Sequence, residues 1–74
     1  MEALLGPTRA RVLMKVAGGS WNTSEVAAGT GISATSASQH LTVLRESGLI
    51  DTTRRGRARH HTITTLGGMI IRAC

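Results

Sequence analysis

Residues 33–48 read SATSASQHLTVLRESG and carry the start, the two faces and the end of one amphipathic helix. Ser33 is suited to accept a hydrogen bond from a free amide of the first turn, and Gly48 to close the last turn in the left-handed conformation. The apolar side chains between them recur at the i, i+4 and i+7 spacing of a buried helical face: Ala37, Leu41 and Leu44. We therefore expect this stretch to pack on a core through these three side chains.

A second face of the same helix, residues 33–47, is polar but uncharged. Its side chains recur at i, i+3, i+4 and i+7: Thr35, Ser38, Gln39 and Thr42. A face that is merely solvated usually carries Lys and Glu, whereas hydroxyls and amides bond to base edges and phosphates. Because Ser and Thr are common on any surface, this face indicates DNA recognition only together with a second signal.

The size and charge of the chain fit one small domain over residues 1–74 with a polyanionic partner. A chain of this length buries only about 60% of its unfolded surface, so oligomerisation would stabilise it. The chain has nine Lys and Arg residues against four acidic residues, and this gives a net charge of +5. The one cysteine, Cys74, cannot form an internal disulfide, which fits the cytoplasm, and no apolar run is long enough to span a membrane.

The chain before this stretch predicts two shorter helices. Pro7 suits the first position of a helix that ends at residue 16 or 17. Its expected inner face and flanks are, in order, Ala10, Leu13, Met14 and Ala17, and then Val12 and Val16. Trp21 is expected to pack partly buried, and the capping-box spacing of Asn22 and Glu25 predicts a helix over residues 23–29. Short helix, glycine turn and longer helix is the order of a helix-turn-helix.

After Gly48 the period changes from 3.6 to 2, which predicts a β-hairpin. Its strands are expected over residues 49–54 and 58–64, with Gly56 at positive φ in the turn. Eight residues without an acid carry the basic side chains Arg54, Arg55, Arg57, Arg59, His60 and His61. Charges also protect exposed strand edges, but four arginines exceed that need, so we expect the tip to contact phosphates or the minor groove.

These elements predict a mostly α fold with a small β-hairpin: a winged helix-turn-helix with a three-helix core, a two-stranded wing and a short C-terminal helix. Thr65 is the expected cap of that last helix, residues 66–74. Its apolar residues form a cluster near a chain end: Met69, Ile70 and Ile71. We expect them to meet Val12 and Val16 in a symmetric pair of chains.

At this point the sequence resembles a known family. The runs GPTRARVLMKVA, TSEVAAGTGISATSASQHLTVLRESGLID and RRGRARHHTITTLG, within residues 4–68, resemble the winged helix-turn-helix of ArsR-type bacterial transcription regulators. The resemblance implies a homodimer on a near-palindromic DNA operator, with the recognition helix 33–47 in the major groove and the wing 54–59 alongside. By matching position, Thr35, Ser38 and Gln39 fall where the family contacts DNA.

The candidate DNA-binding residues therefore come from the helix and the wing: Ser33, Thr35, Ser36, Ser38, Gln39, Thr42, Arg54, Arg55, Arg57 and Arg59. The sequence departs from the family in three places. The start of the second helix reads WNTSEVAA, without the paired cysteines of many metal-sensing members. Thr30 stands where the family usually has Leu, which predicts looser packing there, and the final helix, part of the family's dimer interface, is short.

Other chemistry finds little support in the sequence. His60 and His61 are adjacent on a strand, so they point to opposite faces and cannot chelate one ion. His40 is expected to be structural, and Cys74 has no second cysteine that would make it a redox switch. No catalytic constellation or phosphate-binding loop occurs. We expect no enzyme, no metal site and no cofactor.

Two alternative functions share this fold. One is a winged-helix module for protein contacts inside a larger protein, and the other is non-specific nucleic-acid binding. The polar helix face and the arginines favour the sequence-specific regulator over the protein module, because a protein-binding surface more often carries an apolar patch there. The sequence names neither an operator nor an effector.

Overall fold

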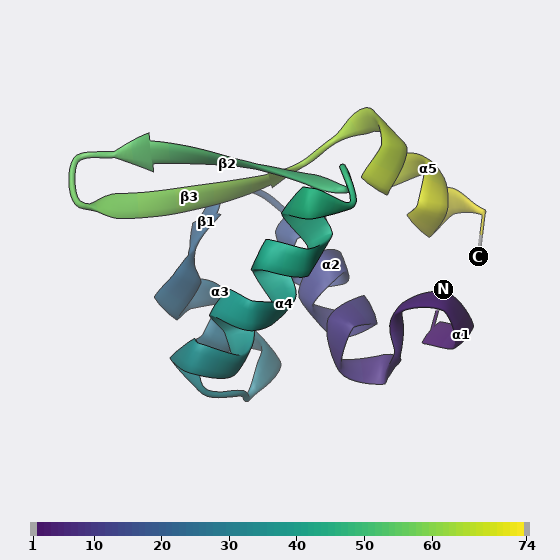
Figure 1. The fold of residues 1–74 in the computed structure, drawn as a ribbon, viewed down its shortest axis with the longest axis horizontal. Helices are drawn as coiled ribbons and strands as arrows, with labels where there is room; N and C mark the ends of the chain where they lie inside the picture. Colours follow the sequence, from purple (N-terminus) through teal and green to yellow (C-terminus); the bar gives the residue numbers. More distant parts are fainter. Residues whose placement is uncertain (1, 74) are drawn as a thin grey trace.

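The computed structural model describes residues 2–73 as a helical body from which a hairpin extends (Figure 1). The elements, in chain order, are α1 (Glu2–Leu5), α2 (Pro7–Ala17), β1 (Trp21–Asn22), α3 (Thr23–Thr30), α4 (Ala34–Glu46), β2 (Ile50–Arg55), β3 (Ala58–Ile63) and α5 (Thr65–Arg72). This order confirms the predicted winged helix-turn-helix. Among the described residues, no helix has both the length and the apolar character needed to cross a membrane.

Helix α4 forms as its sequence predicts. The hydroxyl of its N-cap Ser33 accepts the Ser36 amide at 3.0 Å, and Gly48 has φ +78° just after the last turn. The predicted apolar stripe is the buried one: Ala37, Leu41 and Leu44. Leu44 is completely buried, and removing a side chain of this size from water contributes about 1.5–3 kcal/mol. The apolar stripe therefore fixes which face of α4 points outward.

Helix α3 begins with the predicted capping box. The Asn22 side chain accepts the Glu25 amide at 2.8 Å, and the Glu25 carboxylate accepts the Asn22 amide at 2.8 Å. The expectation of loose packing at Thr30 is wrong, because this side chain is buried and its hydroxyl donates to the Val26 carbonyl at 2.8 Å. The guanidinium of Arg11 donates to the Thr30 carbonyl and joins α2 to the end of α3.

Helix α2 is rotated relative to the predicted inner face. Ala10 and Leu13 are buried as expected, but Val12 and Val16 are fully buried, whereas Met14 is 49% exposed and Ala17 is exposed. The helix packs against α3, α4, β3 and α5 at once, so its buried face is wider than a single stripe. The two valines therefore belong to the core and are excluded from any contact between chains.

The hairpin is confirmed, with Gly56 at φ +59° in the turn, and it belongs to a sheet with strand order β1-β3-β2. Strand β1 was not predicted, because two residues are too few to show a period. It pairs Trp21 with His61 and Asn22 with His60. Trp21 is half-buried as expected, and the Lys15 ammonium lies 3.7 Å from the centre of its ring. The start of α3 is thereby tied to the wing.

Helix α5 is capped by Thr64 and not by Thr65. The Thr64 hydroxyl accepts the Gly67 amide at 3.0 Å and donates to the Gly48 carbonyl at 2.7 Å, while its own amide donates to the Leu49 carbonyl at 3.1 Å. A side chain at Gly67 would collide with that Leu49 carbonyl, so glycine permits the close approach. Residue 74 lies outside the described residues, and with it the expectation for its cysteine.

Candidate nucleic-acid interface

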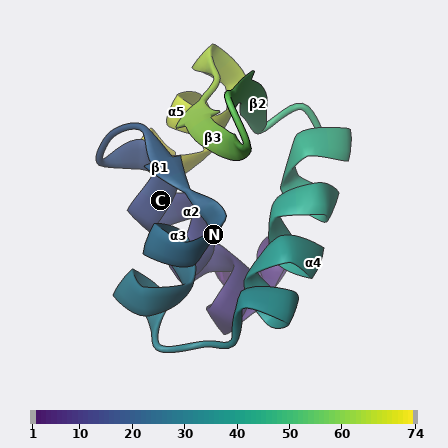
Figure 2. The same cartoon turned by 90° about the vertical axis from the view of Figure 1, so that its left-hand side faces the viewer.

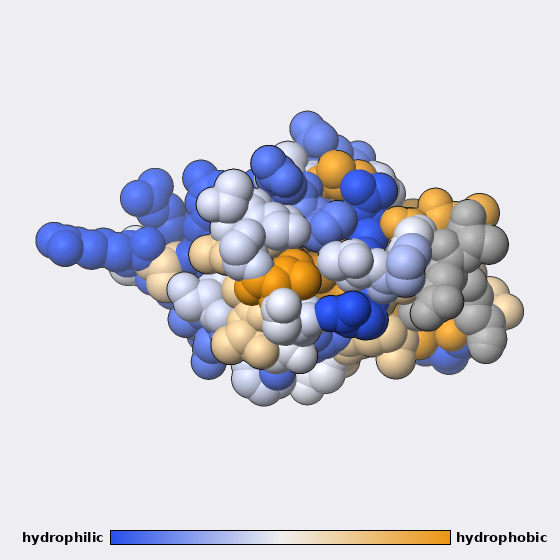
Figure 3. Space-filling view, turned by 90° about the horizontal axis from the view of Figure 1, so that it is seen from below, coloured by the Kyte–Doolittle hydropathy of each residue, from blue (hydrophilic) through white to orange (hydrophobic). Residues whose placement is uncertain are grey.

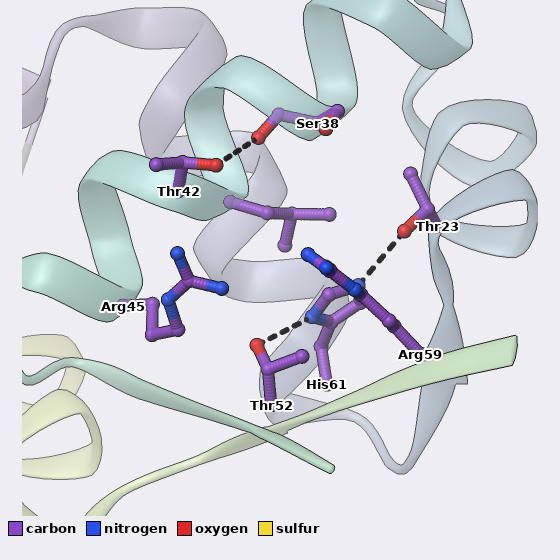
Figure 4. A pocket seen from close by; sticks show the side chains of 8 residues that line it. Thr23, Ser38, Thr42, Arg45, Thr52, Arg59 and His61 are labelled. Carbon is purple, nitrogen blue, oxygen red and sulfur yellow. Dashed lines mark hydrogen bonds between the residues drawn. The ribbon is translucent and has the colours of Figure 1, made fainter. Parts of the chain in front are cut away.

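The outward face of α4 presents the polar stripe that the sequence predicted. Thr35, Ser38 and Gln39 are exposed, and Thr42 is half-buried. The Thr42 hydroxyl donates to the Ser38 carbonyl at 2.9 Å, so its oxygen remains free to accept a further bond (Figure 4). The Gln39 amide can make two parallel hydrogen bonds to a base edge, because it carries a donor and an acceptor side by side.

The two serines at the start of α4 have a different role. The Ser33 oxygen is used as the helix cap, and this leaves its hydroxyl proton available to an outside acceptor. Ser36 is half-buried and supplies the amide that this cap satisfies. Both lie at the helix N-terminus, where the partial positive charge of the helix favours anions. Phosphate contact suits these two positions better than base contact.

The four arginines of the wing are exposed. In the strand register Arg54 pairs with Arg59 and Arg55 with Ala58, while Arg57 lies in the turn. Arg54 and Arg59 therefore share one face of the hairpin. Figure 3 shows hydrophilic side chains extending from the end of the molecule where Figure 1 places the hairpin tip. The wing thus carries its positive charges on a hairpin that projects from the body of the protein.

The histidine His61 was predicted to be part of the basic tip, and this is wrong. It is only 4% exposed, and its ring lies between the hydroxyls of Thr23 on α3 and Thr52 on β2, each 2.9 Å from a ring nitrogen (Figure 4). Burial lowers the pKa of His61, and the nearby charges of Arg45 and Arg59 lower it further. His61 is a neutral structural link between α3 and the hairpin.

A small hollow with a cavity volume of about 20 Å³ lies above this histidine, between α4 and the hairpin. Its lining comes from α3, α4 and both strands of the wing: Thr23, Ser38, Leu41, Thr42, Arg45, Thr52, Arg59 and His61. We call it the seam pocket. Figure 2 shows the arrangement, with α4 along one side and the hairpin seen end-on.

The seam pocket contains functional candidates that sequence reasoning missed. Arg45 was treated only as part of a family motif, and Thr23 and Thr52 were not singled out. The signal for Thr52 and His61 was present, because a hairpin that turns at Gly56 places these two residues opposite each other. The approach of Arg45 to Arg59 depends on how α4 packs on the wing, which no local pattern records.

The remaining candidate chemistry gives no site. Within residues 2–73, no three His, Cys, Asp or Glu side chains gather in a way that would hold a metal ion. His40 is half-buried on the flank of α4, as a structural residue would be.

Comparison with known proteins places these observations in a family. A family model described as "Bacterial regulatory protein, arsR family" matches residues 6–52. A solved "Possible transcriptional regulator for arsenical resistance" is 33% identical, with a TM-score of 0.82 over 97% of this chain and 75% of that chain. A "predicted DNA-binding transcriptional regulator from E. coli" is 32% identical, with a TM-score of 0.82 over 96% of this chain and 81% of that chain.

A third similar structure is the homodimeric winged helix-turn-helix DNA-binding domain of Mb0332 from Mycobacterium bovis. It is 28% identical, with a TM-score of 0.81 over 97% of this chain and 67% of that chain. A search of curated protein sequences gave no significant match.

Proposed function

This chain belongs to the arsR family of bacterial regulatory proteins, and from that premise we propose that it reads a specific DNA sequence with α4. The protein is a DNA-binding transcription regulator and not an enzyme. The observation that carries the proposal is the division of α4 into a buried apolar stripe and an exposed polar stripe without charge. A helix held in this way presents donors and acceptors at fixed positions, as base reading in the major groove requires.

The wing supplies a second kind of contact in this proposal. Its arginines, on the hairpin that extends from the body, bind the DNA backbone or the adjacent minor groove. They are exposed and need no fixed rotamer to attract phosphates. The candidate contacts are those expected from the sequence: Ser33, Thr35, Ser36, Ser38, Gln39, Thr42, Arg54, Arg55, Arg57 and Arg59. The protein acts where the chromosome is, which in a bacterium is the cytoplasm.

We further propose that two copies of the chain associate through the end opposite the wing. Large apolar side chains are exposed on α1, α2 and α5: Leu4 (75%), Met14 (49%), Leu66 (48%) and Met69 (54%). Figure 3 shows hydrophobic residues at that end of the molecule. The similar domain from Mycobacterium bovis is described as homodimeric. A two-fold pair would present two recognition helices to one operator.

Selection from a pool of genomic DNA fragments at physiological salt, followed by sequencing, tests the function. An enriched motif is expected, and a palindromic one would also support the dimer. Enrichment without any shared motif would favour non-specific binding instead. Sedimentation equilibrium tests the dimer separately: Met69→Lys should shift the wild-type dimer toward monomer, and a wild-type monomer at high micromolar concentration would contradict it.

A further inference from the structure

The seam pocket brings residues of the polar stripe and the wing together with others that the proposed contacts do not include. Two arginines reach it from different elements: Arg45 from the last turn of α4 and Arg59 from β3. Figure 4 shows the guanidinium of Arg59 beside the His61 ring and that of Arg45 farther to the side, between Thr42 and Thr52. Among the described residues that line this pocket there is no carboxylate. Its net charge is therefore positive, and this charge favours an anion at the pocket.

The hydroxyl groups of the pocket also include a free donor. His61 is neutral, so one ring nitrogen accepts a hydrogen bond and the other donates one. The threonine that accepts from the ring keeps its own hydroxyl proton free, whether it is Thr23 or Thr52. The pocket thus offers arginine N–H groups and at least one free O–H group, which is the donor set that phosphate oxygens bind.

The position of the pocket identifies the source of the anion. It opens between the polar stripe of α4 and the wing, and it shares Ser38 and Thr42 with that stripe and Arg59 with that wing. A DNA backbone that ran from a groove occupied by α4 to the wing would pass this opening. We propose that the seam pocket binds one phosphate group of the DNA backbone through Arg45 and Arg59. This inference rests on the proposed function and adds Arg45 to its contacts.

Occupation of the pocket has a consequence for His61. The charged groups that act on its ring are Arg45 on α4 and Arg59 and His60 on its own strand, while α3 and β2 face it with hydroxyls. A phosphate between the two arginines would offset their charge and favour the protonated ring. Protonated His61 would also free both threonine hydroxyl protons for the anion. DNA binding should therefore raise the pKa of His61, and the imidazole resonances report occupancy of this one pocket.

Arg45→Gln tests the site, with Arg72→Gln as the matched control. Both arginines lie in the last turn of a helix, but Arg72 is on α5, away from the wing. Binding of a random-sequence duplex is measured between 50 and 200 mM salt, with thermal unfolding to show that both variants fold. Arg45→Gln should lower the slope of log affinity against log salt by about one, so that its loss of affinity across this range should be roughly fourfold smaller than that of wild type. Arg72→Gln should leave the slope unchanged.

A pH titration of the His61 resonances by NMR completes the test in three arms: protein alone, with the duplex, and with inorganic phosphate at constant ionic strength. The duplex should raise the pKa of His61 in wild type and in Arg72→Gln, and should raise it less in Arg45→Gln. An increase with inorganic phosphate but none with the duplex would overturn the assignment to DNA. Equal binding and equal slopes for wild type and Arg45→Gln would also overturn it, whereas a wild-type protein that bound no duplex would overturn the proposed function as well.

Discussion

Helix α4 and the β2–β3 hairpin both carry candidate DNA contacts, but they are held in opposite ways. The helix is fixed along its length by completely or almost completely buried side chains, such as Ala37 and Leu44. The hairpin is anchored at its base, where Ile50 and His61 are buried, while every residue from Thr53 to Arg57 is exposed. One element thus has a fixed polar surface and the other has a charged end that projects from the body.

The difference matches two kinds of recognition. Hydrogen bonds to base edges discriminate only when donor and acceptor are held in place, so they suit side chains on a packed helix. Attraction to phosphates depends on charge and tolerates movement, so it suits an exposed tip. The same protein can therefore separate specificity from affinity between two neighbouring elements. Four experiments test this separation, and they follow from the largest expected effect to the smallest.

The largest effect is expected when α4 loses its support. Leu44→Ala removes a completely buried side chain and should lower the free energy of unfolding by about 2–5 kcal/mol. That is a large part of the stability of a domain this small. Arg55→Ala, at the exposed tip, should change it by less than about 0.5 kcal/mol. Urea denaturation followed by circular dichroism measures both, and similar losses would show that the tip is as firmly packed as the helix.

A smaller effect is expected at Gln39, on binding rather than on folding. Gln39→Ala removes the one side chain of the polar stripe that can form a paired contact with a base, and adenine is its natural partner. Binding to the selected operator should weaken by about 1–3 kcal/mol, while binding to random DNA should stay nearly the same. Fluorescence anisotropy with the two duplexes gives the comparison. Equal weakening on both would mean that α4 does not read bases through Gln39.

The wing should behave in the opposite way. Arg55→Ala and Arg57→Ala should each weaken binding to operator and random DNA by similar factors, because counterion release does not depend on sequence. Each should lower the slope of log affinity against log salt by about one. The same duplexes titrated at several salt concentrations measure this. A loss confined to the operator would assign base reading to the wing and would remove the contrast with α4.

The smallest effect concerns pH and the base of the hairpin. Since the pKa of His61 is lowered on folding from its ordinary 6.5, the unfolded chain binds a proton more readily than the folded one. The stability that the neutral His61 side chain contributes is fully present above about pH 6.5, and it is lost as the pH falls through the pKa of His61 in the folded protein. Wild type should therefore lose stability below pH 6.5 in denaturation curves. The free energy of unfolding of His61→Gln should depend less on pH than that of wild type. A stronger dependence would contradict the assignment of His61 as a neutral structural link.

Much of the fold could be predicted from the sequence because its signals are local. The caps at Ser33 and Asn22, the stripe through Leu41, and the hairpin turn at Gly56 all follow from neighbouring residues. The rotation of α2 could not be predicted, because α3, α4, β3 and α5 all pack on that helix. The close approach at Gly67 depends on the Leu49 carbonyl, which is distant in sequence, so no local pattern reveals it.

The residues of the candidate site likewise fall into those that local sequence signals predict and those that depend on tertiary packing. The exposed side chains of the polar stripe and the wing were predicted, because periodicity and charge are visible in a sequence. The seam pocket was not predicted, because it exists only where α3, α4 and the hairpin meet. His61 illustrates the limit: among arginines in sequence it looked like another basic residue, but in the fold it is buried between two hydroxyls.

The hydrogen bonds of Thr64 link the end of α4 to the start of α5. This one residue joins the carbonyls of Gly48 and Leu49, just after α4, to the first turn of α5. The end of α4 and the start of α5 are therefore linked through one residue, and we expect a tilt of α5 to be transmitted to the end of α4. A partner bound at the apolar end of the molecule would thus change the angle at which α4 faces the DNA.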